Sequence, residues 1–99
     1  MQFKISGKGY NINDLMRKLR YKPIGYSPEG QMSCVRPLGA DYPRFHAYVT
    51  ETKEGYTFNL HLDQKKVSYE GVHAHNGEYE GDIISEERNR IEAVNETLD

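Results

Sequence analysis

The clearest alternation of apolar and polar residues falls on two segments, 44–50 and 57–63, which flank a turn signal. In each segment every second residue is apolar: Phe45, Ala47 and Val49 in the first, and Phe58, Leu60 and Leu62 in the second. A period of two is typical of a half-buried β-strand. The pattern therefore predicts a β-hairpin over 44–66 with one apolar face and one polar face.

The polar face of this hairpin depends on how its two strands are paired. A turn centred on Glu54-Gly55 sets His46 opposite Asp63 and Tyr48 opposite His61, whereas a shift of two residues sets His46 opposite His61. In either register two imidazoles, a carboxylate, a phenol and an amide crowd one patch. These groups belong to His46, His61, Asp63, Tyr48 and Asn59.

The remaining elements follow from shorter patterns. Residues 2–5 predict a first strand, and 24–27 with 31–37 predict a second hairpin around the turn Ser27–Gly30. An apolar stripe at helical spacing predicts a helix that begins at Asn11 or Asn13, runs to about Tyr21 and is stopped by Pro23. Its stripe consists of Ile12, Leu15, Met16 and Leu19.

A second helix is expected to begin at Ser85, with Glu86 and Glu87 in its first turn and a buried stripe that ends at Leu98. Before it lies a glycine-containing stretch of about eighteen residues that folds back on the body. The order of elements predicts one α+β domain over residues 1–99. Its mostly antiparallel sheet has four to five strands, with two helices packed on one face.

The composition indicates how large the core can be and in which cellular compartment the domain is expected. Ninety-nine residues suffice for one core. The single Cys34 excludes an internal disulfide, is read as a small core residue and favours a cytoplasmic location. No apolar run is long enough to span a membrane, so no membrane partner is expected. Free sheet edges are compatible with a monomer or a homodimer.

Charge is distributed unevenly along the chain. Residues 1–69 carry eleven Lys and Arg against six Asp and Glu, and residues 70–99 carry two against nine. An acidic tail folded over a basic body is one interpretation. A basic surface for an anionic partner is the other.

Three kinds of site could use the polar patch, and the leading hypothesis is binding of an anionic ligand, either a phosphorylated small molecule or a nucleic acid. Cations are expected to converge there near His46 and His61. They come from Arg36, Arg44, Lys65 and Lys66.

The second hypothesis is a divalent-metal-dependent hydrolase. His61 and Asp63 would supply two ligands from one strand face, and His75 or Glu78 would complete a set suited to zinc or manganese. In the third hypothesis the domain is a non-catalytic interaction or scaffold protein. His61 and Asp63 then fasten the returning loop through His75 and Glu78.

Four short motifs also resemble those of a family of small prokaryotic proteins to which no activity is attached. The motifs are V-R-P-L-G at 35–39, Y-P-R-F-H at 42–46, N-L-H-L-D-Q-K at 59–65 and H-N-G-E-Y-E at 75–80. The resemblance spans residues 10–95. It implies a shared fold and a shared H-x-D plus H-x-G-E-Y feature, and it assigns no catalytic residue.

Overall fold

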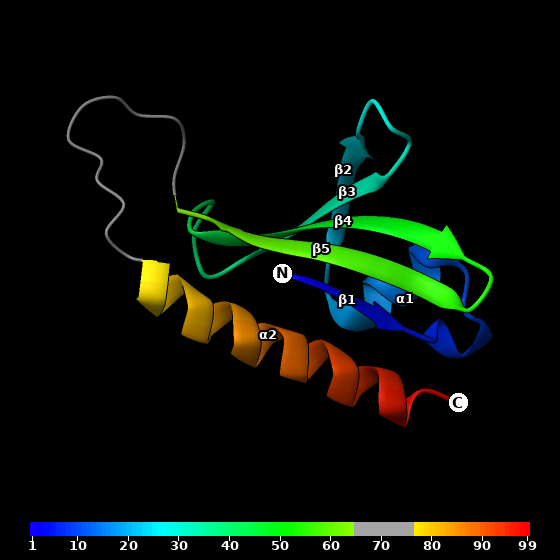
Figure 1. Cartoon of the computed structure of the whole chain (residues 1–99). Helices are drawn as coiled ribbons and strands as arrows, with labels where there is room; N and C mark the ends of the chain where they lie inside the picture. The colour runs from blue at the N-terminus through cyan, green and yellow to red at the C-terminus, as the bar shows by residue number, and fades with distance from the viewer. Residues whose placement is uncertain (65–76) are drawn as a thin grey trace.

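The computed structural model describes residues 1–64 and 77–99, and its framework is a five-stranded antiparallel sheet (Figure 1). The spatial order of the strands is β1-β5-β4-β3-β2. Their bounds are β1 Gln2–Ile5, β2 Lys22–Tyr26, β3 Met32–Pro37, β4 Arg44–Thr52 and β5 Gly55–Asp63. The helical elements are η1 Gly7–Gly9, α1 Ile12–Leu19 and α2 Gly77–Thr97. The predicted α+β class with an antiparallel sheet is confirmed.

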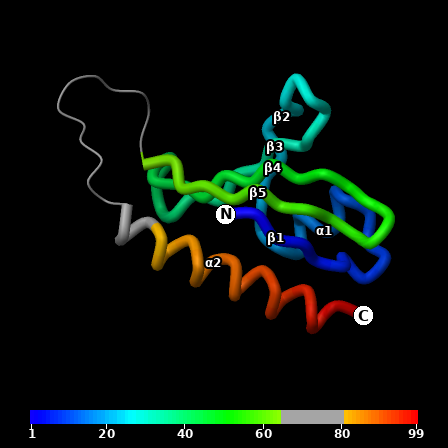
Figure 2. Tube along the Cα trace, viewed as in Figure 1, coloured from blue at the N-terminus to red at the C-terminus, as the bar shows by residue number. Residues whose placement is uncertain are grey.

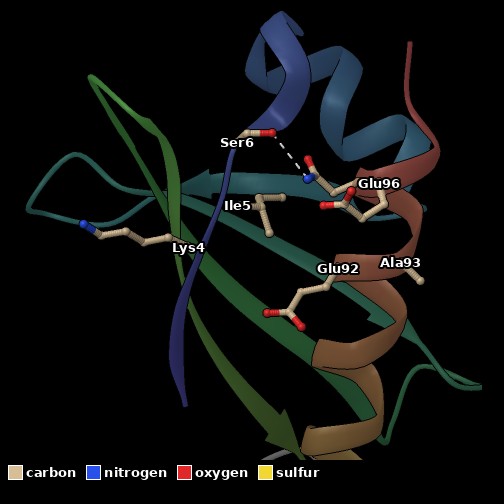
Figure 3. Close-up of a pocket in the computed structure, with 7 residues that line it drawn as sticks. Lys4, Ile5, Ser6, Glu92, Ala93 and Glu96 are labelled. Atoms are coloured by element: carbon tan, nitrogen blue, oxygen red, sulfur yellow. Dashed lines mark hydrogen bonds between the residues drawn. The ribbon is translucent and has the colours of Figure 1, made fainter.

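Both helices pack against the same face of the sheet. Leu15, Met16 and Leu19 of α1 and Ile91 of α2 are fully buried in one core with the apolar side chains of the central hairpin. On β1, Ile5 points toward α2 while Lys4 points to the other side of the sheet (Figure 3). Strand alternation therefore gives the sheet a helix-covered face and a second face, called the open face below.

The last turns of α2 lie beside η1 (Figure 2). There the buried Asn95 accepts a hydrogen bond at its Oδ1 atom from the backbone N–H of Gly7, at 2.9 Å. Its amide also donates to Ser6 Oγ at 3.3 Å (Figure 3). A side chain from the end of the chain thus supplies hydrogen bonds to a turn near its beginning.

The central hairpin adopts the alternative register. Thr52 pairs with Gly55, so the turn consists of Lys53 and Glu54, and His46 lies opposite His61. The register based on a turn at Glu54-Gly55 is wrong. Gly55 has φ +141°, and a Cβ atom there would collide with the backbone of Ile5 and Ser6. Glycine is required at this position because the backbone at the end of β1 approaches it closely, and not because it forms the centre of the turn.

Helix α1 begins as predicted and ends slightly earlier. Asn11 caps it by accepting the backbone N–H of Asp14 at 2.9 Å. The helix stops at Leu19 because Arg20 takes a left-handed conformation (φ 71°) and its N–H returns to the carbonyls of the last turn. Pro23 does not stop the helix, since it lies within the edge strand β2.

Helix α2 begins at Gly77, well before the predicted start at Ser85. Ile83 and Ile84 pack against the core, so the buried stripe extends toward the amino end. The sequence pattern did not predict this part of the helix because it contains Gly81, and glycine has low helix propensity. None of the helices in the described ranges is long and apolar enough to cross a membrane.

The second hairpin and Cys34 match expectation. Gly30 N–H donates to Ser27 O at 2.9 Å, which closes the predicted turn between β2 and β3. The Cys34 side chain is fully buried, and burial raises the pKa of its thiol to about 12. The thiol therefore stays protonated at neutral pH, which fits a small core residue.

Replacing Gly55 by alanine should destabilise the domain by about 3 kcal/mol or more, because it adds a backbone collision to an unfavourable φ. Gly30→Ala is the matched control, since Gly30 also has positive φ (+88°) but no atom lies near the site of a Cβ. It should cost only about 1 to 2 kcal/mol. Urea unfolding followed by circular dichroism measures both, and equal costs would contradict the close approach at Gly55.

Candidate functional site

Six of the ten predicted site residues gather on the open face of β4 and β5. Pairing sets Arg44 opposite Asp63, His46 opposite His61 and Tyr48 opposite Asn59. These six residues alternate along β4 and β5 with core residues such as Ala47 and Leu60. Their side chains therefore point to the open face. The hairpin thus brings two imidazoles, a guanidinium and a carboxylate onto one surface.

Asp63 is the centre of the polar contacts on this face. Its Oδ2 atom accepts a hydrogen bond from Arg44 Nε at 3.1 Å and lies 2.9 Å from His46 Nδ1. Arg44 is held on its other side by Tyr42, with the guanidinium 4.6 Å from the ring centroid. The side chains of His46 and Asp63 are 12% and 30% exposed, so the pair is shielded on the His46 side and accessible on the Asp63 side.

Ser33 of β3 extends this chain of contacts, and sequence reasoning missed it. Its Oγ lies 2.7 Å from His46 Nε2. An ionised Asp63 can only accept, so a neutral His46 carries its proton on Nδ1, and its Nε2 then accepts from the Ser33 hydroxyl. A signal was present in the sequence: Met32 and Cys34 face the core, which puts Ser33 on the opposite face by parity.

Three rings lie side by side on the open face. The ring of Tyr48 is 4.6 Å from that of His46, at 30° between the planes, and 5.9 Å from that of His61 in an edge-on arrangement. Partial burial lowers the pKa of His61, and the N-terminal amine and His46 lower it further, against an opposing effect of Asp63. His61 is therefore mainly neutral at neutral pH and can donate or accept a hydrogen bond.

Arg36 was expected on this face, and that expectation is wrong. It pairs with Phe45 of β4 and lies on the helix-covered side of the sheet, 5.3 Å above the Phe45 ring. Its guanidinium binds both oxygens of Glu87 on α2, at 3.0 and 2.7 Å. Met32 and Cys34, which share its parity, are core residues, so alternation alone excludes Arg36 from the polar patch.

Glu87 is buried and lies in the middle of α2, whereas the sequence predicted it in the first turn of a helix that begins at Ser85. It accepts from Tyr21 Oη at 2.6 Å and from two nitrogens each of Arg36 and Arg90. Arg90 also donates to the carbonyl of Leu19 at 2.7 Å. The carboxylate thus connects α2 to the end of α1 and to β3.

The hydrogen bonds outweigh the cost of burying this charge. Burial alone raises the pKa of Glu87, but hydrogen bonds from Arg90, Arg36 and Tyr21 bring it below its ordinary value. Burial and the Glu87 carboxylate raise the pKa of Tyr21. Glu87 is therefore ionised and Tyr21 neutral at physiological pH, as the network requires.

The described side chains do not supply a third metal ligand beside His61 and Asp63. Among the side chains of residues 1–64 and 81–99, no three from His, Cys, Asp or Glu gather closely enough to hold a metal ion. Asp63 is already bound by Arg44, a cation that a divalent metal would have to displace. His75 and Lys65 lie outside the described residues, and for Glu78 only the helical backbone is described. The metal and loop-fastening hypotheses stay predictions.

No family model, curated protein or solved structure matches the chain. The resemblance to the small prokaryotic family stays a prediction.

Replacing Glu87 by glutamine should lower the free energy of unfolding by about 3 kcal/mol, because two partly buried guanidinium groups lose their counter-charge. Glu86→Gln on the exposed side of the same helix is the control and should change it by less than about 0.5 kcal/mol. Thermal and urea unfolding measure the difference. Equal stability of the two variants would contradict the fastening role of Glu87.

The same carboxylate should make the domain sensitive to acid. The folded pKa of Glu87 lies below the ordinary 4.5, so the unfolded chain binds its proton at the higher pH. Its stabilisation is present above pH 4.5 and is lost as the pH falls through the folded pKa. The difference in unfolding free energy between the parent and Glu87→Gln should therefore shrink in that range. A difference independent of pH would show that this carboxylate is not charged in the fold.

Proposed function

We propose that the open face binds an anionic ligand that carries a planar ring, either a nucleotide-like phosphorylated molecule or a single-stranded nucleic acid. The observation that supports this most is the row of rings formed by His46, Tyr48 and His61, with Arg44 next to it. The helices of the described chain lie on the other face and do not cover this row, in which His61 is exposed, Tyr48 is partly exposed and the His46 side chain is 12% exposed.

The charge of the described open face also favours an anion. Register puts Lys4, Lys22 and Arg44 on this face, and Asp63 is the carboxylate that shares it among the described residues. Lys4 and Lys22 are exposed. Such cations at opposite edges of a sheet suit a ligand that extends across the strands, since a phosphate backbone presents charges at regular intervals.

Ring stacking supplies the second contribution. Bases of single strands stack on aromatic side chains of open sheets and grooves, at about 1 to 3 kcal/mol per base. Tyr48 lies on the central strand β4 and is half-buried between the two imidazoles, so its ring is held at the middle of the surface. The neutral His61 beside it offers a hydrogen bond to a base edge.

The proposal includes a cellular location and an oligomeric state. A cytoplasmic location agrees with the single, buried cysteine. Both edge strands, β1 and β2, lack a second neighbour among the described elements. Pairing of two copies along the exposed β2 would give a homodimer, and a monomer is the alternative.

Binding of a labelled, mixed-sequence single strand, measured by fluorescence anisotropy over a series of salt concentrations, tests the proposal. We expect affinity at low salt that falls steeply as salt rises. Lys22→Gln should reduce the slope of log K against log salt by about 0.7, because one phosphate contact is lost. Tyr48→Ala should weaken binding about 5- to 100-fold through lost stacking.

Lys18→Gln is the matched control, because Lys18 is an exposed lysine on α1. It removes the same charge from the other side of the domain and should leave the slope unchanged. If the parent binds neither the single strand nor a nucleoside triphosphate at low salt, the proposal is wrong. Equal effects of the Lys18 and Lys22 variants would mean that net charge, not this face, governs binding.

A further inference from the structure

Ser33, His46 and Asp63 form one hydrogen-bonded row across the adjacent strands β3, β4 and β5. We propose that this row is a nucleophilic site in which Ser33 attacks the carbonyl carbon of a carboxylic ester. His46 acts as the base, and Asp63 positions the imidazole. The row runs through open-face residues, but the proposed ester chemistry does not depend on nucleic-acid or nucleotide binding.

The atoms that are in contact along this row match those of an activated serine. Nucleophilic serines are activated by a histidine nitrogen, while the other ring nitrogen is oriented by a carboxylate. Here Nε2 of His46 faces Ser33 Oγ at 2.7 Å and Nδ1 faces Asp63 Oδ2 at 2.9 Å. Both distances fall within the hydrogen-bond range that proton transfer requires.

Asp63 is itself held in place, so the row is pre-oriented. Arg44 Nε donates to the same Oδ2 atom that faces His46, at 3.1 Å. Arg44 in turn lies over the Tyr42 ring. Because Arg44 and Asp63 are cross-strand partners, the sheet itself fixes their separation. Asp63 and Arg44 are therefore positioning residues, while Ser33 and His46 would touch the reacting atoms.

The edge strand β2 carries no side chain at the position that pairs with Ser33. Ser33 is only 8% exposed, and its partner on the edge strand β2 is Gly25. Apart from Gly25 itself and its two chain neighbours, no atom lies within 4 Å of where a Cβ on Gly25 would stand. The irregular pairing between Pro23 and Gly25 diverts the intervening Ile24, which is 49% exposed. The β2 edge is therefore the side from which the proposed ester would approach Ser33.

The proposed reaction balances with water as the second reactant. Ser33 Oγ forms a bond to the ester carbonyl carbon as its proton passes to His46 Nε2. The C–O bond to the alcohol then breaks, and the leaving oxygen takes the proton from His46. Water, losing a proton to His46, attacks the acyl–Ser33 ester and releases the carboxylic acid. Ester and water become acid and alcohol, and Ser33 regains its proton.

The developing negative charge on the carbonyl oxygen would be met by side chains. Ser33 lies within a strand that is paired on both edges, so its backbone is not arranged as a free turn. Tyr48 pairs directly with Ser33, and Lys22 pairs with Val35 on the same face. The phenol of Tyr48 and the ammonium group of Lys22 are the donors that we propose for this charge.

The test uses the full chain with two probes, a fluorophosphonate and p-nitrophenyl acetate. With the fluorophosphonate, Ser33 Oγ would displace fluoride from phosphorus, and intact-mass spectrometry should show one adduct per chain. Peptide mapping should locate the adduct at Ser33. With the ester, we expect release of p-nitrophenolate above the rate in buffer alone.

Single substitutions distinguish the nucleophile, the base and the positioning carboxylate. Ser33→Ala should abolish labelling, and His46→Gln should slow it about 100-fold or more. Asp63→Asn should lower the labelling rate at saturating probe without changing the half-saturating concentration, which a merely structural residue would not do. Ser27→Ala is the control, because Ser27 Oγ only accepts backbone N–H groups within its turn. It should label like the parent.

An adduct at Ser33 of the parent supports the proposal even if Ser33→Ala fails to fold. A folded parent that takes no label, or takes it at another residue, overturns the proposal. So does a Ser33→Ala variant that hydrolyses the ester at the parental rate. Because neither readout uses a nucleic acid, these outcomes are distinct from failure of the binding proposal.

Discussion

The pairing of β4 with β5 is the constraint on which the rest of the structure depends. Since side chains alternate along a strand, one register fixes which residues enter the core and which cross-strand partners meet. With His46 opposite His61, Ala47 meets Leu60 in the core and Asp63 falls diagonally beside His46. The same pairing therefore builds the apolar face that the helices cover and the polar row on the open face.

The helices stabilise this arrangement by burying one face only. Ile91 contributes to the core from α2, and Glu87 fastens the same helix through Tyr21 and Arg36. A carboxylate that accepts from two guanidinium groups fixes the position of the helix through directional bonds, whereas apolar contacts alone tolerate sliding. The cations that bind Glu87 are consequently unavailable to a ligand on the open face, and the two polar clusters serve different ends.

Local patterns in the sequence were enough to predict most of the fold. Strand alternation, the Asn11 cap and the Ser27–Gly30 turn each depend on neighbours in the chain. The features that could not be predicted depend on distant contacts. Gly55 meets the backbone of Ile5, Glu87 meets Arg36, and Ser33 meets His46, each between two different elements of the fold. The site was predicted in part for the same reason: parity identified the hairpin residues, while Ser33 needed the β3–β4 pairing.

Backbone nuclear Overhauser effects between β4 and β5 test the central pairing most directly. In an antiparallel pair, opposite residues bring their Hα or amide protons close together, whatever their side chains do. The observed register predicts cross-strand contacts of His46 with His61, Ala47 with Leu60 and Val49 with Phe58. Contacts of Ala47 with Leu62 and of Val49 with Leu60 would contradict it. The row of Ser33, His46 and Asp63 would then not exist as described.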